Sequence, residues 1–79
     1  MARVLLFGRL ADQAGWRDRS VEAGDLSALR AALAAEDAGL GEALAAPGVQ
    51  VAVDKVLVRG EASLAAGAEV AFLPPMSGG

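Results

Sequence analysis

A chain of 79 residues with 54% hydrophobic and 22% charged residues has the composition of one small globular domain and not of a disordered segment. Its net charge is −3 and its basic residues form no cluster, which excludes the basic surface of a nucleic-acid-binding protein. The chain has no Cys, His or Tyr, so thiolate nucleophiles, imidazole bases, disulfides and the usual ligands of transition metals are missing. We therefore expect neither a self-sufficient enzyme nor a metal site.

The apolar residues come in short runs, and none approaches the roughly 20 residues that a membrane helix needs. The run that begins at Val4 is also too short for the apolar part of a secretory signal, and Arg9 soon follows it. We expect a cytoplasmic protein with no membrane contact.

The first half of the chain predicts two strands and a helix. Residues 2–9 contain an apolar run typical of a strand, and residues 11–17 are expected to form a loop or short turn. Residues 20–23 alternate polar and apolar side chains, which suits a second strand antiparallel to the first. Asp25 is a good N-cap, and leucines at spacings of three and four predict an amphipathic helix over residues 26–37.

The second half predicts three more strands. Gly39 is expected to end the helix. The elements expected after it are a helical turn over residues 42–46, strands over 49–53 and 56–59 joined by a turn at Asp54-Lys55, a helical turn over 64–66, and a last strand over 69–73. Pro74 and Pro75 cannot donate ladder hydrogen bonds, so the last strand ends there.

The order β-β-α-β-β-β predicts an α+β domain of the β-grasp, ubiquitin-like type. In this arrangement a mixed sheet of about five strands carries one main helix on one face. We expect residues 1–79 to form this single domain, with residues 74–79 as a flexible tail.

Side chains alternate across a strand, and this predicts which residues face the helix. The inward residues are expected to be Val4, Leu6, Val56, Val58, Val70 and Phe72. Phe7, Leu57 and Leu73 then lie on the face that no helix covers. Isolated exposed hydrophobic residues are common, but a contiguous patch on a small domain is typical of a protein-binding surface, so we predict a partner there.

The chain ends in an unusual tail. Its residues are Pro74, Pro75, Met76, Ser77, Gly78 and Gly79. Because glycine has no side chain, a Gly-Gly end can enter a narrow channel and bring its carboxylate to another protein's catalytic groups. Once activated as an acyl-adenylate, that carboxylate could accept sulfur, and without Cys only the terminus could carry sulfur in this way. The alternative is a frayed end without function.

Several segments together resemble the small subunit of molybdopterin synthase. They are Val4-Leu5-Leu6-Phe7, Leu26-Ser27-Ala28-Leu29, Val53-Asp54, the run from Gly67 to Pro75, and Ser77-Gly78-Gly79. The resemblance implies a sulfur carrier of molybdenum-cofactor biosynthesis. It also implies that an ATP-dependent, ubiquitin-activating-like adenylyltransferase adenylates Gly79 and that a sulfurtransferase converts it to a thiocarboxylate.

The resemblance further implies that the large synthase subunit supplies the catalytic side chains and accepts the tail in a heterotetramer. Sulfur would pass there to cyclic pyranopterin monophosphate, and this chain would bind no cofactor itself. Two alternatives remain. One is a carrier for thiamine synthesis, tRNA thiolation or the tungsten cofactor, and the other is a ubiquitin-like modifier or plain interaction module.

Overall fold

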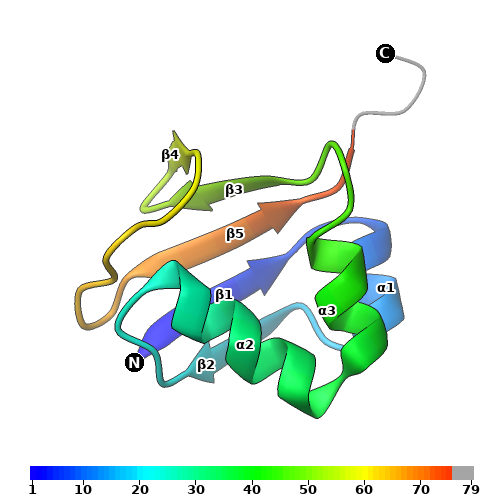
Figure 1. Ribbon diagram of the computed structural model, residues 1–79, viewed down its shortest axis with the longest axis horizontal. Helices are drawn as coiled ribbons and strands as arrows, with labels where there is room; N and C mark the ends of the chain where they lie inside the picture. The colour runs from blue at the N-terminus through cyan, green and yellow to red at the C-terminus, as the bar shows by residue number, and fades with distance from the viewer. Residues whose placement is uncertain (76–79) are drawn as a thin grey trace.

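Five short strands form one mixed sheet in the computed structural model, which describes residues 1–75 (Figure 1). The elements along the chain are β1 (Ala2–Leu6), α1 (Arg9–Ala14), β2 (Asp18–Val21), α2 (Leu26–Glu36), α3 (Ala38–Leu44), β3 (Gln50–Val53), β4 (Val56–Val58) and β5 (Glu69–Leu73). The strand order across the sheet is β2-β1-β5-β3-β4, in which β1 and β5 pair in parallel and all other neighbours are antiparallel. This arrangement confirms the predicted β-grasp fold.

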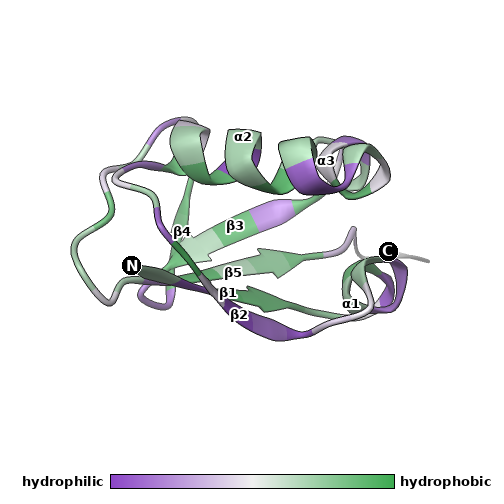
Figure 2. Cartoon of the chain, turned by 90° about the horizontal axis from the view of Figure 1, so that it is seen from below, coloured by the Kyte–Doolittle hydropathy of each residue, from purple (hydrophilic) through white to green (hydrophobic). Residues whose placement is uncertain are grey.

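The core lies between the sheet and the helices on one of its faces (Figure 2). The largest fully buried side chains are Phe72, Leu6, Leu29, Leu33, Leu40, Val4 and Val70. Those from the sheet belong to β5, the central strand, and to its neighbour β1, as the alternation of apolar residues predicted. The first and last strands therefore meet at the centre of the domain, so the core directly supports the point where the chain leaves the sheet.

The helix α2 begins where the sequence predicts. The Asp25 carboxylate accepts a hydrogen bond from the backbone N–H of Ala28, 2.7 Å away, and Leu26, Leu29 and Leu33 are buried on the face that meets the sheet. A side-chain acceptor at this position satisfies one of the N–H groups that have no partner in the first turn.

The prediction that Gly39 ends this helix is wrong. The helix α2 already ends at Glu36, and Gly39 lies inside α3. Asp37 separates the two helices because its carboxylate accepts from the backbone N–H of Leu40, 3.1 Å away, and so starts α3. A Cβ at Gly41 would lie 2.6 Å from the Cβ of Ala34, so this glycine allows α3 to pack closely against α2.

We expect Asp37→Ala to lower the free energy of unfolding by about 1 kcal/mol, because α3 loses its N-cap. Glu22→Ala is the matched control, since it removes the same charge from an exposed side chain without a described hydrogen bond. Urea unfolding of both variants measures the difference. Equal midpoints for the two variants would contradict this role of Asp37.

Two other short segments differ from the prediction. Residues 9–14 form the helix α1. Six residues are too few to show a helical periodicity in the sequence, and this helix forms because Leu10 and Ala11 are buried in the core. Residues 64–66 form no helical turn. This segment is instead tied to the start of α2, where the backbone N–H of Leu64 donates to the carbonyl of Gly24 at 3.0 Å.

The strands β3 and β4 form the predicted hairpin. Asp54 and Lys55 both have positive φ, 49° and 71°. A two-residue hairpin turn of type I′ requires positive φ at both of its central residues. The expected burial of Val56 is wrong. Its register with Val53 points it toward the helix side, yet it is 64% exposed, because β4 is the outermost strand and lies away from α2 (Figure 1).

Candidate functional site

The stem of the tail is held by two glycine-containing loops. The strand β5 ends at Leu73, and Pro74 and Pro75 follow it as the last described residues, both half-buried. A Cβ at Gly8 would lie 3.0 Å from the Cγ of Pro74, and one at Gly48 would lie 2.9 Å from the Cβ of Pro75. These two glycines therefore set the direction in which the chain leaves the sheet.

Both glycines also have backbone conformations that other residues adopt only at a cost. Their φ angles are 56° for Gly8 and 90° for Gly48. The sequence interpretation missed them, since nothing local marks a contact with a segment so distant along the chain. The predicted tail residues Met76, Ser77, Gly78 and Gly79 lie outside the described residues.

The sheet face opposite α2 and α3 carries a continuous row of apolar residues. The strand registers pair Leu5 with Ala71, Ala71 with Ala52, and Ala52 with Leu57, so one row crosses β1, β5, β3 and β4. Leu57 is 59% exposed, Leu5 and Ala71 are half-buried, and Ala52 is buried. Figure 2 shows the two helices packed against the other face of the sheet.

The other two predicted partner-binding residues lie beside the tail. Phe7 directly follows β1, and its backbone N–H donates to the carbonyl of Phe72 at 3.2 Å, which places it next to Leu73. Phe7 is 43% exposed and Leu73 is half-buried. We call the six residues Leu5, Phe7, Ala52, Leu57, Ala71 and Leu73 the open-face patch. Leu5, Ala52 and Ala71 were not among the predicted binding residues.

The opposite end of the same face is ionic. The guanidinium of Arg3 donates from Nε to the Asp18 carboxylate at 3.0 Å and lies 4.0 Å from Glu69. The hydrogen bond from Arg3 lowers the pKa of Asp18 below its usual range and raises the pKa of Arg3. The face therefore changes from charged to apolar along β1 and β5 toward Pro74 and Pro75.

Among residues 1–75 no polar or charged side chain is buried, and no group of three or more Asp or Glu side chains is placed to bind a metal ion. No helix in this part of the chain is long and apolar enough to cross a bilayer. The described residues thus combine an apolar sheet face with a packed stem at Pro74 and Pro75.

The strand order and the helices on one face of the sheet define a β-grasp, ubiquitin-like fold. The chain belongs to the ThiS family, whose model matches residues 4–79, and it is therefore a ubiquitin-like sulfur carrier. Carriers of this family work with activating enzymes and sulfurtransferases.

Solved structures agree with this fold. The chain is similar to CysO of Mycobacterium tuberculosis, an antigen, with a TM-score of 0.82 and 24% identity over 96% of this chain and 100% of that one. It is also similar to SAMP1 of Haloferax volcanii, with a TM-score of 0.72 and 29% identity over 99% of this chain and 98% of that one. A comparison with curated protein sequences finds no match.

Proposed function

We propose that this chain is the small subunit of a molybdopterin synthase and carries sulfur as a thiocarboxylate on Gly79. Membership of a sulfur-carrier family over residues 4–79 is the observation that supports the carrier role most strongly. The narrower assignment to molybdopterin rests on the resemblance of the segment from Gly67 to Pro75 and of the Ser77-Gly78-Gly79 ending.

The chemistry starts at the carboxylate of Gly79. An activating enzyme uses ATP: a carboxylate oxygen attacks the α-phosphate, pyrophosphate leaves, and the acyl-adenylate forms. Sulfide (HS⁻) delivered by a sulfurtransferase then attacks the carbonyl carbon, the C–O bond to AMP breaks, AMP leaves, and the terminus is a thiocarboxylate. The thiocarboxylate sulfur attacks a carbon of cyclic pyranopterin monophosphate in the large subunit, and an oxygen substituent leaves that carbon. Water then hydrolyses the resulting thioester: the C–S bond to Gly79 breaks, the sulfur stays on the product, and the carboxylate is restored.

In this scheme residues 1–75 bind the partner protein and set the direction of the C-terminal tail. The open-face patch docks on the partner, because apolar surface beside the tail is removed from water in the complex. Gly8 and Gly48 hold Pro74 and Pro75, so the tail starts from a defined point. All acid and base groups belong to the partners, which agrees with the absence of His and Cys.

Co-purification distinguishes the pathways. We expect the tagged chain to bring down a large synthase subunit from its native cell, and the purified pair to form molybdopterin from cyclic pyranopterin monophosphate. Recovery of a thiazole synthase in its place would overturn the molybdopterin assignment. Accumulation of Lys conjugates linked to Gly79 would instead support a protein modifier.

We expect Phe7→Glu to weaken binding of the activating enzyme by about tenfold or more, because a charge is then buried in an apolar interface. Ala31→Glu is the control, since it adds the same charge at an exposed position of α2 on the opposite layer. Isothermal titration calorimetry of both variants measures the affinities. Unchanged affinity for the Phe7 variant would show that the open-face patch is ordinary surface.

A further inference from the structure

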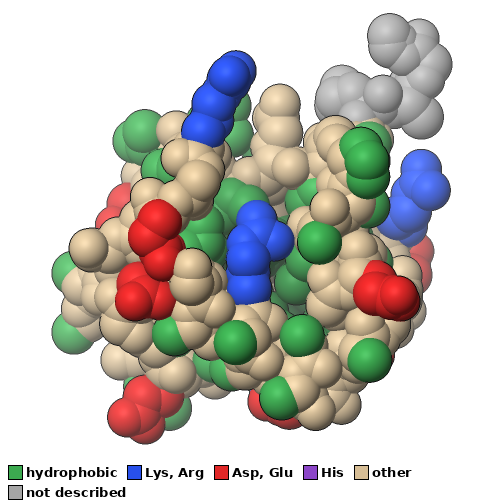
Figure 3. Space-filling model, in the orientation of Figure 1, with side chains coloured by type: hydrophobic (Ala, Val, Ile, Leu, Met, Phe, Trp, Pro, Cys, Tyr) green, Lys and Arg blue, Asp and Glu red, His purple; other side chains and the backbone are tan. Residues whose placement is uncertain are grey.

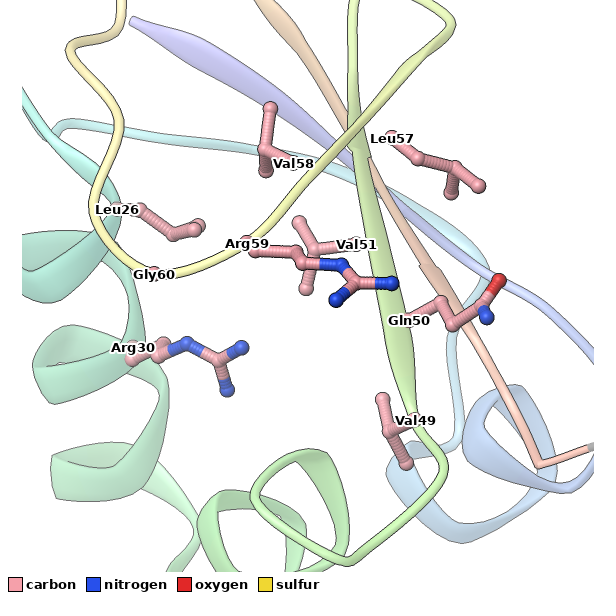
Figure 4. Close-up of a pocket in the computed structure, with 9 residues that line it drawn as sticks. All are labelled: Leu26, Arg30, Val49, Gln50, Val51, Leu57, Val58, Arg59 and Gly60. Carbon is pink, nitrogen blue, oxygen red and sulfur yellow. The ribbon is translucent and has the colours of Figure 1, made fainter.

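A groove of about 350 Å³ opens on the helix side of the domain, between α2 and the β3–β4 hairpin. Leu26 and Arg30 come from α2, Val51 and Val58 come from the hairpin, and Arg59 follows β4. Figure 4 shows both guanidinium groups directed into the space between α2 and β3. In the space-filling view, basic side chains lie at the centre and the rim of this hollow, with apolar side chains between them (Figure 3).

The two arginines have no acidic partner within the part of the chain that the structure describes. The ion pairs found there involve Arg3 and Arg19 only. None of the residues that line the groove is acidic, although the chain as a whole carries a net charge of −3. Glu61 lies nearby, but its carboxylate accepts from the backbone N–H groups of Ser27 and Ala62. The groove is thus a positive site on a negative protein.

Arg30 is fixed in position by contacts that do not neutralise it. Its guanidinium lies 5.3 Å from the centre of the Phe72 ring, and Nη1 donates to the carbonyl of Leu44 at 3.2 Å. An arginine has five N–H donors, so most of them remain for a ligand. Because the side chain is already ordered, a carboxylate that binds it loses less entropy than it would on a mobile arginine.

The two edges of the sheet differ in how they are protected. On the β2 edge, Asp18 and Arg19 form ion pairs with Arg3 and Glu36, and Arg19 also lies over the Trp16 ring. Charged side chains of this kind discourage pairing with another strand. The β4 edge consists of Val56, Leu57 and Val58, of which the first two are the most exposed apolar side chains of the sheet. It leaves backbone N–H and C=O groups on the outer side of β4 open for pairing.

We propose that an extended, acidic segment of a partner protein binds along β4 and in this groove. Its backbone adds a strand to β4, an apolar side chain packs between Leu26 and Val58, and a carboxylate pairs with Arg59 and Arg30. An extended peptide fits better than a small anion because only a polypeptide satisfies the open strand edge. Leu57 belongs to the open-face patch and also lines this groove, so the two surfaces meet at β4.

Selection from a random peptide library displayed on phage tests this proposal on the full-length chain. We expect the selected peptides to contain Asp or Glu beside aliphatic or aromatic residues. By fluorescence anisotropy, Arg59→Gln and Arg30→Gln should each weaken their binding about tenfold or more, because a charge-assisted hydrogen bond is lost. Arg17→Gln removes the same charge from an exposed side chain outside the groove and should change nothing. Amide hydrogen exchange should slow at β4 when peptide is bound.

Arg59 is exposed and has no described side-chain hydrogen bond, so its substitution tests the site even if the Arg30 variant unfolds. The proposal is overturned if selection gives no acidic peptides, or if their affinity is the same for Arg59→Gln and Arg17→Gln. It is also overturned if the groove is filled by this protein itself. An Arg59-dependent dimer in analytical ultracentrifugation would show a second copy there, and tighter peptide binding after deletion of residues 76–79 would show the chain's own tail.

Discussion

Deletion of Gly79, or addition of one residue after it, is expected to abolish sulfur transfer and leave the melting temperature unchanged. The reacting carboxylate must reach catalytic groups in the partner, and one extra residue moves it by about 3.5 Å. The buried core cluster runs from Ala2 to Phe72, so we expect it to form without the changed end. Single-turnover transfer to the synthase substrate and thermal unfolding followed by circular dichroism measure the two effects.

Substitution of Ser77 by alanine is the control for this experiment, because it changes the tail without changing its length. We expect this variant to keep most of the activity. A lengthened chain that transfers sulfur at the normal rate would contradict the proposed use of the terminus.

The second large effect is expected at Gly48. In the Gly48→Ala variant the new methyl group would lie 2.9 Å from Pro75, so either the loop or the tail stem must move. A displacement of about 1 Å in a reacting group can cost about 100-fold in rate, and we expect a loss of that order in sulfur transfer. The positive φ of 90° adds a destabilisation of about 1–2 kcal/mol.

The Gly67→Ala variant separates the effect of the contact with Pro75 from the effect of the positive φ. Gly67 has a φ of 80°, close to that of Gly48, but nothing lies within 4 Å of the position its Cβ would take. It precedes β5, whereas Pro75 follows that strand, so this variant should lose similar stability and keep its transfer rate. If both variants lose transfer equally, or if neither does, the contact between Gly48 and Pro75 does not aim the tail.

Much of the fold could be predicted because apolar alternation and leucine spacing are local signals. They located the five strands and α2, and Asp25 marked the start of that helix. The sequence could not reveal α1 because tertiary burial of Leu10 and Ala11, not periodicity, makes those six residues helical. Gly39 was misleading because Asp37 had already started a new helix two residues earlier.

The candidate site was predictable in part, because alternation along a strand is also a local signal. Alternation along a strand placed Phe7, Leu57 and Leu73 opposite the core, and the strand registers show how Leu5, Ala52 and Ala71 join them in one patch. Contacts between distant segments gave no such signal. The packing of Gly8 on Pro74 and the position of Arg30 over Phe72 depend on the closed sheet, and a single sequence does not report them.

The central claim is that Gly79 carries sulfur, and intact mass spectrometry of the protein from its native cell tests it most directly. We predict a species heavier than the unmodified chain by the replacement of one oxygen with sulfur, and fragmentation should locate this change at Gly79. The species should disappear when the activating enzyme is deleted. Native protein that contains only the unmodified carboxylate, in cells that are making molybdopterin, would contradict the proposal.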